Sequence, residues 1–275
     1  MERTSIALDV PRHTATVRKR RLPGFPLGLL LPALALLGAE LGVRAGLVPA
    51  NLLPPPSSVF EALSWLFDNG LGTHIGASAL RVAAGFAAGA LLALALGALV
   101  ALDRTAARLF DPSFQALRAI PSLAWVPLLL LWFGIDETPK VILIAIGAFF
   151  PVYMGVVAGI RGVERSLVEV GLLYRLSPFA LARRVLLPAA LPSVLTGLRN
   201  GLSLAWMFMV AAELIAASRG LGYLLTDGRE TGRADIMLAA IVLLALLGKL
   251  SDSAMGAVER RSLAWRDSLS ESEAR

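Results

Sequence analysis

The chain has 275 residues, of which 56% are hydrophobic and 17% are charged, and its mean hydropathy is +0.70. A soluble domain carries about 25% charged residues, so this composition excludes an ordinary soluble protein and predicts a polytopic protein of the lipid bilayer. The absence of cysteine excludes disulfides, thiolate catalysis and thiolate metal sites.

Six apolar segments approach the roughly 20 residues that a membrane-spanning helix needs. They lie at residues 25–43, 79–102, 118–134, 141–160, 194–216 and 234–251. A basic segment, 1–24, precedes the first and raises the question of a signal peptide, but no small-residue cleavage site follows a short apolar region, so we expect a retained span. The sequence therefore predicts an all-α fold with a six-span domain at 25–251 and a C-terminal tail at 252–275.

The distribution of basic residues predicts the orientation of these spans. With the N-terminus inside, the cytoplasmic segments hold 19 of the 26 lysines and arginines, including three in residues 103–119 and five in residues 161–193. This bias places both termini in the cytoplasm. It also accounts for the net charge of +6 without a nucleic-acid partner.

The third and fourth spans have two local signals. Pro121 and Pro127 lie within the third, which we expect to be kinked or broken where other helices or a water-lined path satisfy the freed carbonyls. Residues 134–140 connect the two spans tightly and predict antiparallel neighbours.

A basic, amphipathic helical hairpin is predicted at residues 163–192, between the fourth and fifth spans. Ser166 and Glu169 have the spacing of a capping box, so a first helix should run to about Tyr174. Ser177 followed by Pro178 predicts a second helix start. That helix should end before Pro188, with Arg183 in its final turn. The alternative is a helix pair that lies on the bilayer surface.

Here the chain resembles a known family. Glu169-Val-Gly171, a turn, and Val185-Leu-Leu-Pro188-Ala-Ala-Leu-Pro192 resemble the EAA loop of permeases of ATP-binding cassette importers. The motifs Arg118-Ala-Ile-Pro121, Leu131-Trp-Phe-Gly134, Ala212-Glu213 and Gly220-Leu-Gly222-Tyr223 are similar to the aliphatic sulfonate, taurine and nitrate branch, with aliphatic sulfonate permeases the most similar. The likeness covers about 60–260.

The resemblance implies a type I ABC importer permease fold and a docking surface for ATPase subunits. The residues that it places in this surface are Glu169, Gly171, Tyr174, Arg175, Ser177, Pro178, Phe179, Arg183 and Pro188. Two of them depart from the family pattern: Gly171 replaces the third residue of the triplet, and Arg175 stands where the family has a glycine. If the turn needs a positive φ, a non-glycine residue there costs on the order of 1 kcal/mol. Either the turn has adjusted, or Arg175 contacts the partner.

The resemblance also implies the partners. The chain contains no GxxxxGK[ST] phosphate-binding loop, so it holds no cofactor of its own, and ATP would be bound by two separate cytoplasmic ATPase subunits. Two copies of the permease would rock between inward-open and outward-open states, and an extracytoplasmic binding protein would deliver the substrate.

Five residues are candidates for the translocation path or its gate: Pro121, Trp125, Phe133, Arg199 and Glu213. Glu213 is a costly ionisable group in an apolar run, and we favour a role in bracing the 218–223 turn over direct substrate contact. Arg199 has two open interpretations: it faces an anionic substrate, or it extends toward the inner headgroups.

The sequence thus predicts the permease of an importer for aliphatic sulfonates or a related small oxoanion. Nitrate, taurine and thiamine-precursor permeases share most of these motifs. An ATP-independent secondary transporter or channel is the alternative from another class, against which the hairpin argues. A membrane-bound hydrolase using His74 and Ser78 lacks a nucleophile turn and a further partner, so we expect neither an enzyme nor a metal site.

Overall fold

A computed structural model describes residues 27–265, and every element in that range is helical. The elements are α1 (Leu27–Arg44), α2 (Pro56–Asp68), α3 (Leu71–Leu102), α4 (Arg104–Ala119), the 3-10 turn η1 (Ser122–Trp125), α5 (Val126–Phe133), α6 (Glu137–Arg161), α7 (Arg165–Leu173), α8 (Pro178–Leu181), the π turn η2 (Ala182–Leu186), α9 (Leu187–Ala216), α10 (Leu221–Glu230) and α11 (Ala234–Ser262). The predicted all-α fold is confirmed.

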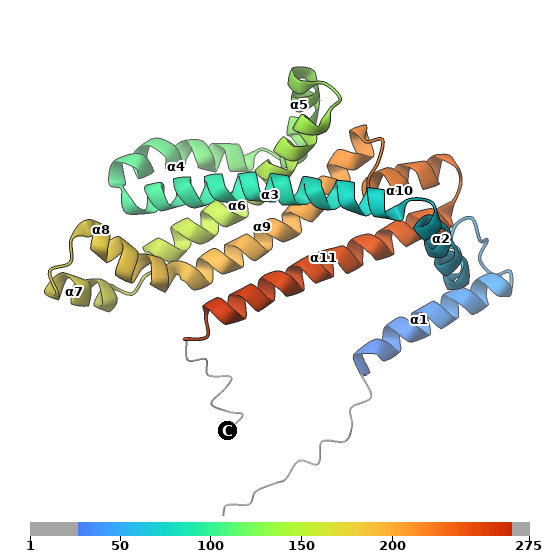
Figure 1. Ribbon diagram of the computed structural model, residues 1–275, viewed down its shortest axis with the longest axis horizontal. Coiled ribbons are helices and arrows are strands. Elements are labelled where there is room, and N and C mark those ends of the chain that lie inside the picture. The colour runs from blue at the N-terminus through green and yellow to red at the C-terminus, as the bar shows by residue number, and fades with distance from the viewer. Residues whose placement is uncertain (1–26, 266–275) are drawn as a thin grey trace, which may run out of the picture.

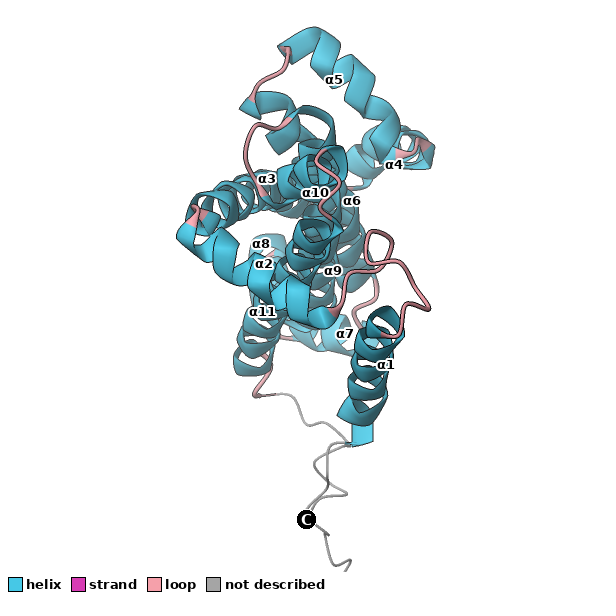
Figure 2. Ribbon diagram, turned by 90° about the vertical axis from the view of Figure 1, so that its right-hand side faces the viewer, coloured by secondary structure: helices cyan, strands magenta, loops and turns pink. Residues whose placement is uncertain are grey.

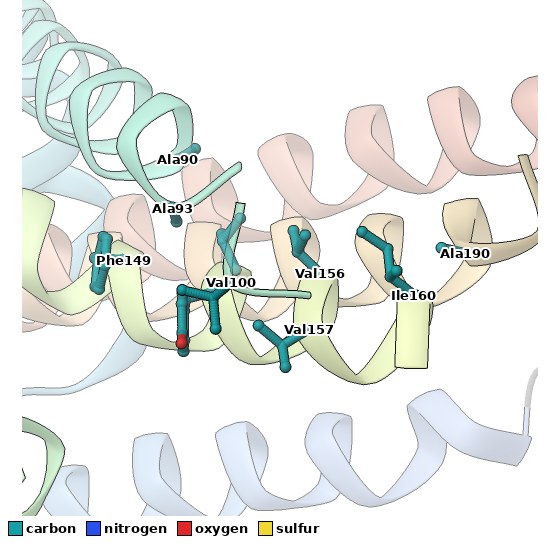
Figure 3. Close-up of a cluster of buried hydrophobic side chains, with 10 residues drawn as sticks. Ala90, Ala93, Val100, Phe149, Val156, Val157, Ile160 and Ala190 are labelled. Atoms are coloured by element: carbon teal, nitrogen blue, oxygen red, sulfur yellow. The ribbon is translucent and has the colours of Figure 1, made fainter. Parts of the chain in front are cut away.

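Three long helices, α3, α6 and α9, form the centre of the bundle (Figure 1). Small residues let their backbones approach: a side chain at Gly155 of α6 would meet the backbone of Gly197 and Ser193 on α9. A cluster of buried side chains fills the seam, with Ala93 and Val100 from α3 facing Val156 of α6 (Figure 3). This core makes the centre of the bundle a rigid frame for the peripheral elements.

The bundle has two distinct ends. At one lie the short helices α7 and α8, between α6 and α9 (Figure 1); we call it the hairpin end. At the opposite end lie α2 and α10, where Ala62 and Leu66 of α2 and Leu221 of α10 are buried in one cluster with α11. α1 lies to one side of the central helices and α5 to the other (Figure 2).

Four helices in the described range are long and apolar enough to cross a bilayer, namely α3, α6, α11 and the continuous helix Pro178–Ile215, and the bent pair of α4 and η1–α5 brings the number to five. α1 occupies the place of the predicted first span, whose residues 25–26 lie outside the described part. The six-span count stays a prediction. α11 continues past the predicted boundary at residue 252 to Ser262, and the division into domains stays a prediction.

The break expected from the prolines is present near the start of the third predicted span, where α4 and the η1–α5 segment meet at 90°. Pro121 is the N-cap of η1, and Pro127 falls at the start of α5, where its missing N–H leaves no bond unmade. The predicted start at residue 118 was wrong. Residues 104–119 were interpreted as a connecting segment, but they form α4. This helix is strongly amphipathic, so its polar face lowers the average hydropathy and hides the apolar face.

Candidate functional site: the hairpin and a buried polar cluster

The hairpin begins with α7, whose start differs from the prediction. The N-cap is Glu164, with no side-chain cap bond, so the capping box of Ser166 and Glu169 was wrong. Because the helix begins at Arg165, Ser166 already lies inside it. Glu169 instead accepts a 2.8 Å hydrogen bond from Arg165 Nε, one helical turn before it, and both side chains are exposed.

α7 ends in a left-handed turn at Arg175. Arg175 has φ 53° and is the one non-glycine residue with positive φ in the described range. Its N–H donates to Leu172 O (2.9 Å), and the N–H of Leu176 donates to Gly171 O (3.2 Å). These two bonds define a Schellman motif, in which Tyr174 is the C-cap and Arg175 takes the position that glycine normally fills. The turn has therefore not adjusted to arginine.

The second arm starts as predicted and ends differently. Ser177 Oγ accepts from the N–H of Ala180 (3.3 Å), and Pro178 is the first helical residue, so this helix start is confirmed. The predicted end before Pro188 was wrong. The chain passes through the π turn, which contains Arg183, directly into α9. Pro188 falls in the first turn of α9, where a proline is tolerated.

Packing inside the hairpin centres on Gly171. It is buried, and a side-chain carbon there would overlap the Leu181 methyl group from the second arm. The outer surface of the hairpin is apolar and open: Leu173, Tyr174 and Phe179 are 81%, 79% and 77% exposed. An exposed patch of this kind on a polar-rimmed element is typical of an interaction surface.

At the opposite end, Glu213 of α9 is the centre of a buried polar cluster. Its carboxylate accepts from Arg81 Nη1 (2.7 Å), Ser78 Oγ (2.8 Å) and the N–H of Gly222 (2.7 Å). Arg81 also donates two bonds to Glu137 at the start of α6, of 2.6 and 2.7 Å. Every polar group of the Glu213 side chain therefore has a partner, as a buried charge requires.

The cluster joins three spanning helices to the start of α10. Arg81 Nη1 donates to the backbone oxygen of Arg219, and Ser78 Oγ accepts from the N–H of Leu221 (2.8 Å). Gly220, at φ 134°, lies so close to Glu213 that a side-chain carbon would overlap the carboxylate. Contact between Glu213 and the 218–223 turn is thus present, as bracing requires, while a gating role stays a proposal. His74 and Ser78 bond to this turn separately, through Gly220 and Leu221.

The remaining candidates occupy two places. Trp125 and Phe133 line an almost wholly apolar cavity of about 530 Å³ between α3, α4, α5 and α6. Arg199 instead pairs with α11: it donates to both oxygens of Asp252 and reaches Glu259 at 3.5 Å. Neither interpretation of Arg199 anticipated this pairing. The Arg199 guanidinium is therefore paired within the chain, and a contact with substrate stays untested by this geometry.

Sequence reasoning missed Arg81 and Glu137 as cluster residues. Arg81 was counted only as an outer basic residue, and Glu137 as part of a connecting loop. The signal that points to them is an ionisable residue set at the edge of a long apolar run on two different spans. Their pairing depends on the packing of α3 against α6, which no local pattern reveals.

Comparison with solved structures identifies the fold. A chain of the MetNI methionine ABC transporter, crystallised in inward facing conformations, superposes with a TM-score of 0.58 at 22% identity, over 72% of this chain and 96% of that one. The fold is therefore that of a type I ABC importer permease.

Sequence comparison gives the family. Residues 85–263 match the family model described as binding-protein-dependent transport system inner membrane component, and the chain belongs to this family of transport permeases. It is 40% identical to the putative aliphatic sulfonates transport permease protein SsuC of Bacillus subtilis (strain 168), over 98% of this chain and 99% of the relative. It is 42% identical to the protein of the same description from Escherichia coli (strain K12), over 82% and 86%.

Proposed function

We propose that this permease forms the translocation path of an ATP-driven importer for aliphatic sulfonates or a related small oxoanion. The observation that carries the proposal is the exposed apolar tip of the hairpin, at Leu173, Tyr174 and Phe179. Exposure of three large apolar side chains to water is unfavourable, so a protein partner that covers them is favoured.

In this proposal the partner is a cytoplasmic ATPase. The hairpin supplies an apolar centre with basic residues around it, Arg175 and Arg183 among them, which suits a groove with an acidic rim. Glu169, Ser177, Pro178 and Pro188 would contact the partner only at the margins of the hairpin, and the buried Gly171 would shape the hairpin from within. Two permease copies and two ATPases would bring two such hairpins together when ATP binds.

The same proposal fixes the orientation. The hairpin end lies on the cytoplasmic side of the bacterial inner membrane, and both termini lie on the same side. This orientation is consistent with the distribution of basic residues. The segments 1–24 and 252–275 are then cytoplasmic at the ends of the permease domain 25–251, although α11 continues into the second of them. The buried cluster around Glu213 braces the outer gate, where a binding protein delivers substrate.

Support for the substrate class comes from the names of the two relatives, which describe them as aliphatic sulfonates permeases. Nitrate, taurine and thiamine-precursor transport are the alternatives within the family. An ATP-independent secondary transporter is the alternative from another class, and it gives no reason for the exposed hairpin tip.

Uptake of a radiolabelled short alkanesulfonate by cells with and without this chain tests the proposal. We expect uptake that requires the chain and disappears when ATP is depleted while the proton gradient is maintained. Uptake that survives ATP depletion would contradict the importer. ATP-dependent uptake of nitrate or taurine in its place would replace the substrate and leave the mechanism standing.

A further inference from the structure

Arg118 lies part-way along the bundle, away from its hairpin end, and its side chain is exposed. Arg118 lies in the last turn of α4, and its Nη1 is 3.5 Å from the sulfur of Met154 on α6. Met154 is seven residues before the end of α6 at Arg161, which is about 10 Å along a helix that rises about 1.5 Å per residue. In the sequence, Arg118 falls both in the basic segment 103–119 and at the predicted start of the third span.

Arg118 also lacks a charged partner. Among residues 27–265, four other cations on the spanning helices pair with carboxylates; they are Arg81, Lys140, Arg161 and Arg199. Arg118 has no carboxylate within 4.0 Å in the described part of the chain, and its recorded hydrogen bond there goes to a thioether, which is a weak acceptor. A charged side chain that faced lipid without a counter-charge would be unfavourable in free energy.

The side chain faces a cavity between η1, α6 and α9. The cavity has a volume of about 320 Å³. Arg118 and Ser122 are the two described lining residues with polar side chains; the rest of the lining is apolar and includes Phe150, Met154, Met207 and Phe208. The site therefore offers a fork of guanidinium donors on one side and an apolar surface on the other.

We infer that Arg118, with Ser122, forms an oxoanion-binding subsite in the translocation path. The guanidinium binds two oxygens of a sulfonate or similar head group, because its parallel N–H groups match two oxygens on one atom. The aliphatic part of the substrate lies against the apolar wall. This inference rests on the proposed function and deepens it, since it gives the path a defined substrate contact. A binding subsite of this kind is what an unpaired intramembrane arginine provides.

The absence of cysteine from the chain allows a chemical-rescue test. Arg118→Cys is introduced into the complete transporter in proteoliposomes, with its ATPase and binding protein, and treated with aminoethyl or sulfonatoethyl methanethiosulfonate. Each reagent forms a disulfide with the thiol and releases methanesulfinate, and the first restores a positive charge. Arg108→Cys, on the same helix and also exposed, is the matched control. The untreated and treated wild-type complex controls for reaction elsewhere.

We expect Arg118→Gln and Arg118→Cys to lower ATP-dependent alkanesulfonate uptake by about tenfold or more, the effect of losing a charge-assisted hydrogen bond. The aminoethyl reagent should restore a large part of the uptake, and the sulfonatoethyl reagent should not. Arg118→Lys should retain more uptake than Arg118→Gln. Arg108→Cys should stay within about twofold of wild type throughout, as surface positions usually do.

Two results would overturn the inference: wild-type uptake by Arg118→Gln, or equal rescue by both reagents. The rate at which the reagents modify Arg118→Cys, measured apart from uptake, separates this inference from the proposed function. If the wild type imports no alkanesulfonate, taurine or nitrate, the proposed substrate class fails, and the rate at which water-borne reagent modifies Arg118→Cys still decides whether the position lines an aqueous path. No modification under these conditions would exclude it.

Discussion

Arg81 and Glu213 form an ion pair that is almost completely shielded from solvent. Arg81 Nη1 and Glu213 Oε1 are 2.7 Å apart, and the two side chains are 5% and 0% exposed. Arg81 lies on α3 and Glu213 on α9. The Nε and Nη2 groups of the same guanidinium donate to Glu137 of α6. One arginine thus connects three spanning helices at the end opposite the hairpin.

Removal of the Glu213 charge should destabilise the protein strongly. Glu213→Gln leaves Arg81 buried without its inner counter-charge, and breaking a buried pair costs about 3–5 kcal/mol. Glu137→Gln is the matched control, because Glu137 is 51% exposed and retains access to water; we expect about 1 kcal/mol or less there. Thermal unfolding of the two variants in detergent measures the difference. Equal losses would show that burial does not set the cost.

Arg175→Gly should stabilise the hairpin turn by about 1 kcal/mol, because glycine accepts the positive φ of the Schellman motif without strain. Arg175→Ala is the control, since it removes the guanidinium but keeps the strained conformation. Thermal unfolding and copurification with the ATPase are measured together. If both variants lose transport, Arg175 makes an essential contact of its own; if only the alanine variant is impaired, the backbone is what matters.

Phe179→Ala should weaken ATPase association without lowering the unfolding temperature of the isolated permease. Phe179 is 77% exposed, so truncation removes little internal packing, whereas a buried aromatic anchor at an interface contributes about 2 kcal/mol or more. The matched control is Phe67→Ala on α2, where the side chain is 78% exposed at the opposite end of the bundle. Copurification with the ATPase measures the effect. Equal recovery of ATPase by both variants would remove Phe179 from the docking surface.

Gly155→Ala should destabilise the bundle by about 1–3 kcal/mol, because the added carbon would meet backbone atoms of Ser193 and Gly197 that cannot rotate away. Gly248→Ala has open space around it in α11 and should be neutral or stabilising by up to about 1 kcal/mol. The unfolding temperatures of the two variants are compared in one detergent. A stabilising effect at residue 155 would mean that α6 and α9 can separate without cost.

The four long spans and the Ser177–Pro178 helix start could be predicted because the signals are local. Long apolar runs mark α3, α6, α9 and α11, and a hydroxyl followed by proline marks a helix start. α4 could not be predicted in the same way, since Arg104, Asp111 and Arg118 lower its average hydropathy while its apolar face packs on the core.

The polar cluster and the position of Arg118 required the packed structure. Arg81 lies 56 residues from Glu137 and 132 from Glu213, so their proximity follows from helix packing. Arg175 shows the opposite case: the sequence revealed the departure from the family pattern, and the backbone φ shows that the turn keeps the left-handed conformation, while a contact of Arg175 with the partner stays a prediction.

Because no loop separates the second arm of the hairpin from α9, residues Pro178–Ile215 form one helix of 38 residues. At about 1.5 Å per residue this helix is about 55 Å long. It carries Phe179 near one end and Glu213 near the other, so a rigid-body tilt of the helix would move both residues. A tilt of about 10° around its centre would move its two ends by about 5 Å each in opposite directions. Displacement of the hairpin tip would then move Glu213, whose carboxylate binds the N–H of Gly222 at the far end.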